Sequence, residues 1–233
     1  MSSMYSTEPQ TRGRVTLTTT HGDVDCELWA TECPHACRSF LELATSGYYD
    51  GLPFHRIVAG SLVQTGRRPG AETEAHLLRS HVPPRDEVVS RIRFARRGML
   101  AMARHTRAHA SPDEGENLPY GQFFVTLDSC PWLDGRHVIF GTVGQASPTI
   151  FNMLRVGNAE VEEGTDKAVD PAPAVTGVKV LECPFGDILP TLDAPWREKE
   201  GADGTKKKKK KRKGKKDANV LSFGDEGGEG DFE

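Results

Sequence analysis

The side chains best suited to chemistry lie in a short segment, residues 47–66, in which two apolar runs flank Ala59-Gly60-Ser61. This tripeptide has the composition of a β-hairpin turn. In a hairpin centred on Gly60, Arg56 lies opposite Gln64 on one face of the strand pair. A guanidinium beside an amide, next to apolar surface, could hold a peptide backbone. The segment therefore predicts a peptide-binding site.

Short strands are expected along most of the chain before residue 190, because β-branched and alternating runs recur between turn residues. The expected strands are residues 14–20, 23–28, 54–58, 62–64, 98–103, 122–127, 138–143 and 175–183. Strands this short and this numerous, with few helices between them, favour a closed antiparallel barrel. We expect residues 67–91 and 104–121 to form long loops, since both lack periodicity and contain prolines and glycines.

Two helices are predicted from their end signals and apolar stripes. In the first, Thr31 can cap the start, Pro34 suits the first turn and Gly47 stops the helix. In the second, Ser147 can cap a helix that has Pro148 at its first position and that ends at Gly157. The fold class expected is mainly β: a closed eight-stranded antiparallel barrel capped by two helices, followed by a disordered charged tail.

Composition limits the kind of protein. The mean hydropathy is −0.51, which is low for a chain that is folded throughout its 233 residues. No apolar run reaches the roughly 18–20 residues of a membrane span, and no signal-peptide segment is expected at the start. The five cysteines are scattered without a paired CxxC motif, and Cys33 and Cys37 are spaced for one face of a helix. Buried thiols in a reducing compartment, without a metal or cofactor, are expected.

Charge is strongly segregated along the chain. Residues 206–216 contain ten Lys and Arg, and residues 217–233 contain six Asp and Glu. The rest of the chain then holds 20 basic and 27 acidic residues, which is a net charge of −7. We expect an N-terminal extension at 1–13, one domain at 14–190 and a charged tail at 191–233. A short apolar stretch, residues 220–224, could be a binding motif within that tail, or it could be incidental.

The sequence resembles the cyclophilins, a family of peptidyl-prolyl cis-trans isomerases, over roughly residues 14–183. The segments that carry this resemblance are residues 48–58, Gln64, 98–103, 121–127 and 132–141. Within the family, the chain is similar to nuclear, spliceosome-associated cyclophilins that carry a long charged C-terminal tail. This narrower resemblance depends on the basic segment 91–97, on residues 151–155 and 183–190, and on the Leu221-Ser-Phe-Gly-Asp-Glu ending.

The resemblance implies a catalytic role for Arg56, as a hydrogen-bond donor to the prolyl imide nitrogen, and no cofactor or metal. It also implies a proline pocket and a groove for the substrate backbone. The implied substrate-binding residues are Leu62, Gln64, Ala103, Gln122, Phe124, Trp132, Leu133 and His137. Alternation along the strand puts Phe123 and Phe124 on opposite faces, so only Phe124 is expected in the pocket.

Three positions depart from the family pattern. Ser61 stands where the family has a large aromatic residue that forms a wall of the pocket. The absence of that aromatic side chain removes apolar contact worth about 1–3 kcal/mol. Arg104 and His105 replace a small Asn-Ala pair at the groove. We therefore expect reduced isomerase activity, or binding of prolyl peptides without useful turnover.

Three functions compete at this point. The chain could be a fully active isomerase that assists protein folding, or a monomeric binding module recruited to the spliceosome by its surface and tail. Lys206–Lys216 could also tether RNA non-specifically, but a lysine run without interleaved aromatic residues is more typical of a nuclear-import signal. The expected partners are proline-containing segments and spliceosomal proteins, in the nucleus and away from membranes.

Overall fold

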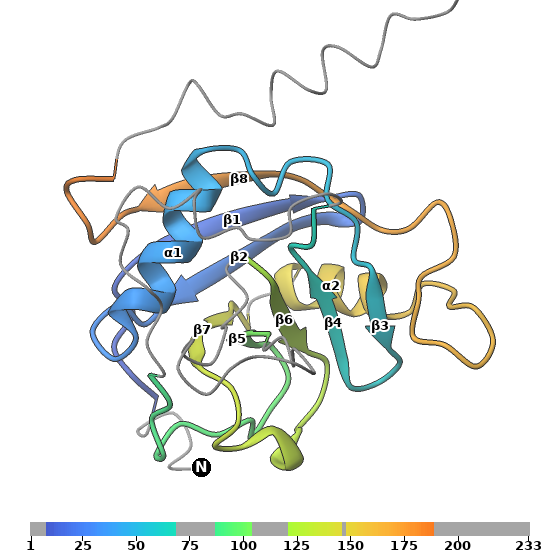
Figure 1. Ribbon diagram of the computed structural model, residues 1–233, viewed down its shortest axis with the longest axis horizontal. Helices are drawn as coiled ribbons and strands as arrows, with labels where there is room; N and C mark the ends of the chain where they lie inside the picture. The colour runs from blue at the N-terminus through green and yellow to red at the C-terminus, as the bar shows by residue number, and fades with distance from the viewer. Residues whose placement is uncertain (1–7, 69–86, 104–120, 146–147, 189–233) are drawn as a thin grey trace, which may run out of the picture.

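The computed structural model describes residues 8–68, 87–103, 121–145 and 148–188. One antiparallel sheet dominates this part of the chain and curls around an apolar core (Figure 1). Its strands are β1 (Arg14–Thr19), β2 (Gly22–Leu28), β3 (Arg56–Val58), β4 (Leu62–Thr65), β5 (Met99–Met102), β6 (Phe123–Thr126), β7 (Ile139–Val143) and β8 (Val175–Glu182). The prediction of eight short antiparallel strands is confirmed, with bounds that differ by one or two residues.

The prediction of a closed barrel is wrong. The strand order is β3-β4-β6-β5-β7-β2-β1-β8, so β3 and β8 are the two ends of an open, curled half-barrel. Backbone bonds outside the strands draw these ends together: Phe54 N–H donates to the Pro173 carbonyl at 2.8 Å, and Gly51 N–H donates to Val175 at 2.8 Å. These bonds leave the ladder itself unclosed, because the segment before β3 pairs only at the start of β8.

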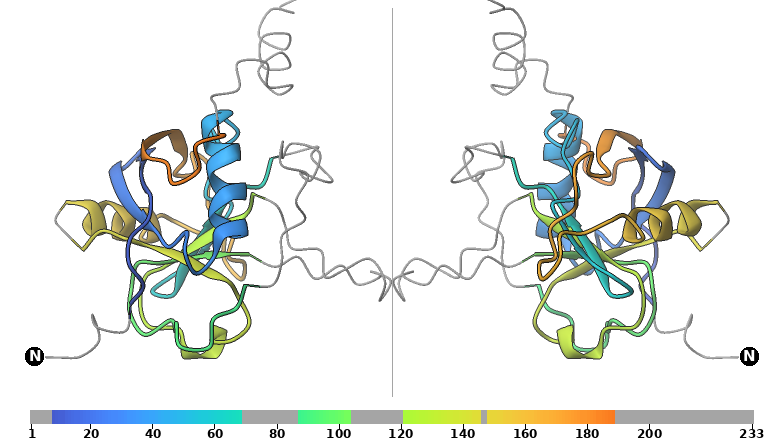
Figure 2. Two further views of the ribbon diagram at one scale, coloured as in Figure 1. Left: turned by 90° about the vertical axis from the view of Figure 1, so that its left-hand side faces the viewer. Right: turned by 90° about the vertical axis from the view of Figure 1, so that its right-hand side faces the viewer.

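Two helices pack on the inner core from opposite sides of the molecule (Figures 1 and 2): α1 (Pro34–Thr45) and α2 (Thr149–Gly157). Thr31 was expected to cap α1, but the helix begins after Cys33 without a side-chain cap at that position. Instead the Glu87 carboxylate accepts the His35 and Ala36 N–H groups, both at 3.0 Å. A carboxylate at this end satisfies free N–H groups and opposes the helix dipole.

The start of α2 also differs from expectation. Pro148 is the residue before the first helical turn rather than within it, and the expected cap Ser147 lies outside the described residues. The buried thiols predicted for Cys33 and Cys37 are confirmed, since both side chains are fully buried. No helix in the described ranges is long and apolar enough to span a membrane.

The sheet separates two apolar clusters. The larger one fills the inside of the curl and includes Phe40, Phe123 and Phe140. The smaller one, here called the outer cluster, is Trp29, Leu62, Ile92, Phe94, Met99, Ala101, Ala103, Phe124, Cys130 and Ile139. The prediction that Phe123 and Phe124 point to opposite faces is therefore confirmed. The predicted binding residues Leu62, Ala103 and Phe124 all belong to the outer cluster.

Candidate functional site

Three strands place the residues of the predicted site in one row on the outer face. Arg56 in β3 lies opposite Gln64 in β4, as the hairpin pattern predicts, and Gln64 lies opposite Phe124 in β6. Phe124 in turn lies opposite Ala101 in β5. Directly paired residues of an antiparallel sheet share a face, so a cation, an amide and an aromatic ring follow one another across the sheet.

The cation of this row is held from the side away from Gln64. The Arg56 Nε and Nη2 atoms donate to Oδ2 of Asp166 at 3.0 and 2.9 Å, and Ile57 N–H donates to the Asp166 carbonyl at 2.7 Å. Both side chains are about half exposed, 49% for Arg56 and 46% for Asp166. Exposed pairs are worth about 0–1 kcal/mol, so the guanidinium can leave Asp166 for another acceptor at little cost.

The amide of the row is fixed by a second amide. Gln64 Nε2 donates to Oε1 of Gln122 at 3.2 Å, and the Gln122 carbonyl accepts the Ala103 N–H at 3.0 Å. The structure therefore brings three of the predicted groove residues together at the end of β6. Gln64 does not bond to Arg56, although their backbones are in register.

The aromatic ring of the row is enclosed by two others. The Phe124 side chain is 3% exposed, stacks on Phe94 with ring centroids 5.7 Å apart, and meets the edge of His137 at 5.1 Å. His137 Nδ1 lies 3.1 Å from the Met102 carbonyl, which can only accept, so Nδ1 carries the proton. Phe94 is a wall of this cluster that sequence reasoning missed, because it comes from the basic segment 91–97.

The remaining predicted pocket residues differ in exposure. Leu62 is buried and Leu133 is half-buried against the outer cluster, whereas Trp132 is 58% exposed on the short helix η2 (Pro131–Leu133). Apolar area and an exposed indole thus lie beside the row, which is an arrangement suited to an apolar ring of a ligand. Arg104 and His105 lie outside the described residues.

Ser61 occupies the turn at the edge of this surface. Its hydroxyl lies 3.9 Å from the Sγ atom of the fully buried Cys130, and its carbonyl accepts the Leu127 N–H at 2.7 Å. Burial raises the pKa of the Cys130 thiol, with the Ser61 hydroxyl partly opposing this effect. A neutral, buried thiol is a poor nucleophile, so Cys130 serves packing at this position.

His55, next to Arg56, makes the stability of the fold depend on pH. Burial, then the charges of Arg67 and Arg56, lower its pKa to about 4. The unfolded chain protonates this histidine near pH 6.5, so its contribution to stability is complete above about pH 6.5 and is lost as the pH falls towards 4.

We expect the His55→Gln variant to lose less stability than wild type between pH 7 and pH 4.5, by about 1 kcal/mol once solvent screening of the half-buried ring is allowed for. Urea unfolding at several pH values measures this difference. Parallel pH profiles for the two proteins would contradict the assignment.

The described residues include no group of three or more His, Cys, Asp or Glu that could hold a metal ion. These residues offer a row of hydrogen-bonding groups beside apolar surface. The described part of the chain is thus an open, curled eight-stranded sheet with two helices and with this row on its outer face.

Comparisons with known proteins identify the family. The model described as cyclophilin type peptidyl-prolyl cis-trans isomerase/CLD matches residues 14–180. The chain belongs to the cyclophilin-type peptidyl-prolyl cis-trans isomerase family. A Cryptosporidium parvum member solved in the presence of the dipeptide Ala-Pro is similar in structure, with a TM-score of 0.55 and 28% sequence identity over 73% of this chain and 99% of that one.

Longer relatives match nearly the whole chain. Peptidyl-prolyl cis-trans isomerase CYP57 of Arabidopsis thaliana is 41% identical over 226 residues, which is 97% of this chain and 42% of the relative. Peptidyl-prolyl isomerase CWC27 of Cryptococcus neoformans is 37% identical, and the Spliceosome-associated protein CWC27 homolog of Danio rerio is 38% identical; for each, 97% of this chain matches 44% of the relative. The chain thus spans less than half the length of these curated relatives.

Proposed function

We propose that this chain is a spliceosome-associated, nuclear cyclophilin that binds proline-containing segments of partner proteins and has weak peptidyl-prolyl isomerase activity. The observation that carries the binding function is the Arg56–Gln64–Phe124 row on the outer face. The assignment to the spliceosome draws on the names of the relatives, two of which are called CWC27 and one of those spliceosome-associated.

In the proposed mechanism, Arg56 acts on the twisted state of the prolyl bond. Rotation must break amide resonance, with a barrier of about 18–20 kcal/mol. The imide nitrogen becomes basic only when the bond is twisted, so a donor placed there stabilises the transition state more than the ground state. The exposed guanidinium, bound weakly by Asp166, is free to turn towards that nitrogen.

The other residues of the site hold the substrate in this proposal. The Gln64–Gln122 pair and the backbone at Ala103 fix the peptide chain, while the ring of proline packs beside Leu62, Leu133, His137, Phe124 and the exposed Trp132. Ser61 leaves this apolar surface smaller than a large aromatic side chain would. The reduced contact supports weak turnover, with binding as the main activity.

A fully active isomerase is the second candidate. The exposed Arg56 favours it, because the proposed donor is present and accessible. In either case we propose one domain at residues 14–190 and a tail at 191–233. We propose that the Lys206–Lys216 run of this tail contacts RNA non-specifically. The chain is proposed to be monomeric outside its complex. The tail lies outside the described residues.

Affinity capture from nuclear extract tests the proposed association. We expect the full chain to enrich spliceosomal proteins, identified by mass spectrometry, and a chain without residues 191–233 to enrich fewer of them. Arg56→Ala is expected to lower the enrichment much less than loss of the tail does, because the guanidinium acts mainly on the twisted prolyl bond and contributes little to binding of the ground state.

A nuclease-treated extract separates protein contacts from RNA tethering. Enrichment that persists after treatment supports protein partners, whereas enrichment that disappears shows that RNA held the complexes through the lysine run. Recovery of no spliceosomal protein by either chain would overturn the assignment.

A further inference from the structure

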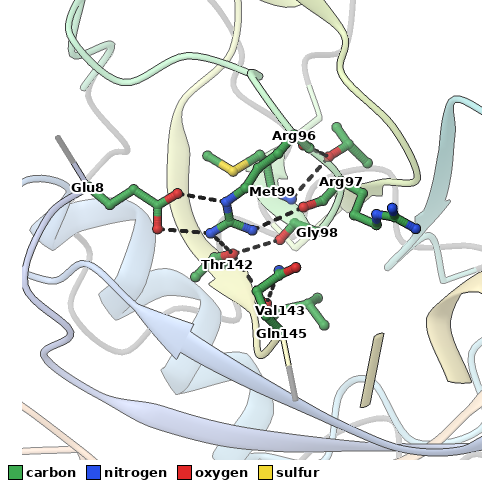
Figure 3. Close-up of polar contacts among 9 residues, drawn as sticks. Glu8, Arg96, Arg97, Gly98, Met99, Thr142, Val143 and Gln145 are labelled. Atoms are coloured by element: carbon green, nitrogen blue, oxygen red, sulfur yellow. Dashed lines mark hydrogen bonds and ion pairs between the residues drawn. The ribbon is translucent and has the colours of Figure 1, made fainter. Parts of the chain in front are cut away.

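A second polar centre lies at the opposite end of β6 from Gln122, in the basic segment Arg91–Arg97 that precedes β5. Four of its seven residues are arginines. Figure 3 shows its central contact: Arg96 Nε and Nη2 donate to the two carboxylate oxygens of Glu8, at 2.7 and 2.8 Å. This two-point geometry is the strongest and most selective way in which arginine binds a carboxylate.

The fold fixes the Arg96 guanidinium independently of Glu8. Arg96 Nη2 also donates to the Thr142 hydroxyl in β7, and Nη1 donates to the Arg97 carbonyl, both at 3.0 Å. The Thr142 hydroxyl donates in turn to the Gly98 carbonyl at 3.0 Å (Figure 3). The Arg96 side chain is only 16% exposed with Glu8 in place, and its bonds to Thr142 and to the Arg97 carbonyl do not involve Glu8, so they orient the fork for a carboxylate.

The surroundings of this fork form a depression with basic and apolar walls. It is lined by Glu8, Arg91, Ile92, Arg93, Ala95, Arg96 and Met99. The charge of Arg91 is already opposed by Glu32 at 2.9 Å, whereas no ion pair is found for Arg93 within the described residues. Ile92 and Met99 are buried and belong to the outer cluster.

Glu8 differs from the other lining residues because it precedes the first strand. It reaches the depression from the segment before β1, 88 residues away in sequence from Arg96. Two backbone bonds between Arg12–Gly13 and Leu28 anchor the chain behind it. Glu8 thus has the position of a tethered ligand rather than that of a framework residue.

We propose that the Arg96 depression is a binding site for an acidic segment of a partner protein, and that Glu8 occupies it until the partner replaces it. The planar fork fits a carboxylate, Arg93 offers a second positive charge, and the Ile92–Met99 floor accepts an apolar side chain between acidic residues. The site is distinct from the Arg56 row, so this proposal goes beyond isomerisation.

A tethered ligand lowers the apparent affinity of a competing one, because only the fraction of molecules with an open site can bind. Removing the Glu8 carboxylate should therefore reveal the site. The probe is a fluorescein-labelled peptide of alternating glutamate and leucine, titrated against the full chain and followed by fluorescence anisotropy. A peptide with glutamine in place of glutamate is the matched probe.

We expect Glu8→Ala to bind the acidic probe about tenfold more tightly than wild type, and the glutamine probe no more tightly. The double variant with Arg96→Ala should lose this gain. Any binding of the probe to the lysine run contributes equally to both variants and cancels in the comparison. Arg14→Ala, which removes an exposed arginine paired with Glu182, is the control for loss of a positive charge and should keep wild-type affinity.

Thermal melting guards against a variant that misfolds. The acidic probe should raise the melting temperature of Glu8→Ala but not that of Glu8→Ala with Arg96→Lys, because lysine keeps the charge and loses the fork. Prolyl isomerisation by Glu8→Ala should stay at the wild-type rate, so failure of this proposal is distinguishable from failure of the proposed function.

Equal affinity of Glu8→Ala and wild type for the acidic probe would overturn the proposal. So would Arg96-dependent binding of a labelled single-stranded RNA in the absence of peptide binding, because the site would then recognise phosphate. If probe binding increases only after deletion of residues 217–233, the chain's own acidic end occupies the site. That result would also overturn the proposal that the occupant is a segment of a partner protein.

Discussion

Arg56→Ala is expected to lower kcat/KM for an Xaa-Pro peptide by about 100- to 1,000-fold, which is the usual effect of removing a donor that acts on the transition state. KM should change much less than kcat, because the guanidinium contributes little to binding of the planar ground state. Protease-coupled or NMR exchange measurements on one peptide give both constants. The side chain is half exposed, so the fold should be unaffected.

Two control variants distinguish the effect of the Arg56 guanidinium from the effects of losing its ion pair or of losing any exposed arginine. Asp166→Asn removes only an exposed ion pair worth about 0–1 kcal/mol, so kcat/KM should change by less than about fivefold. Arg14→Ala removes an exposed arginine far along the sheet and should have no effect. Wild-type turnover in Arg56→Ala would remove Arg56 from the mechanism.

The companion variant Ser61→Phe addresses the strength of the activity. It adds apolar surface at the turn next to Leu62 and should raise kcat/KM if the missing wall limits turnover, since buried apolar contact of this size is worth about 1–3 kcal/mol. A wild-type rate equal to that of a typical cyclophilin, with no gain in Ser61→Phe, would favour the fully active isomerase.

Phe124→Ala is expected to destabilise the domain by about 3–5 kcal/mol, because it empties a ring-sized space that is 3% exposed and lies between Phe94 and His137. For a domain of this size the melting temperature should fall by about 10 °C or more. Calorimetry or circular dichroism measures the change.

The control for Phe124→Ala is Phe151→Ala on α2, where the ring is 54% exposed. That variant should melt within about 1–2 °C of wild type. Phe124→Leu should recover much of the stability while isomerisation stays low, because leucine fills volume without the flat ring face. An unchanged melting temperature in Phe124→Ala would show that the outer cluster does not support the fold.

Local patterns in the sequence predict the row of the site well. The turn at Gly60 sets the register of the β3–β4 hairpin, so the pairing of Arg56 with Gln64 follows from a short stretch of chain. Alternation likewise separates Phe123 from Phe124. Strand positions were predictable for the same reason: each depends on side chains close together in sequence.

Contacts between distant residues were not predictable in this way. The Arg56–Asp166 pair joins residues 110 apart, and Glu87 caps α1 from more than 50 residues away. Glu8 meets Arg96 across 88 residues. Such pairs depend on how loops cross the sheet, and no periodicity records that path. The open sheet was missed similarly, because strand number alone does not decide whether the end strands pair.

Strand β6 illustrates how recognition can diverge while the fold is inherited unchanged. Phe123 and Val125 belong to the inner core, and Phe124 between them belongs to the outer face. Substitutions at the odd-numbered positions Phe123 and Val125 therefore act on the inner core, whereas a substitution at Phe124 acts on the outer cluster, and so on both stability and the proposed binding surface. A one-residue insertion would exchange the two sets together. Substitutions can thus change the outer surface while the two faces stay separate, whereas an insertion or deletion within the strand would move core residues to the outer face.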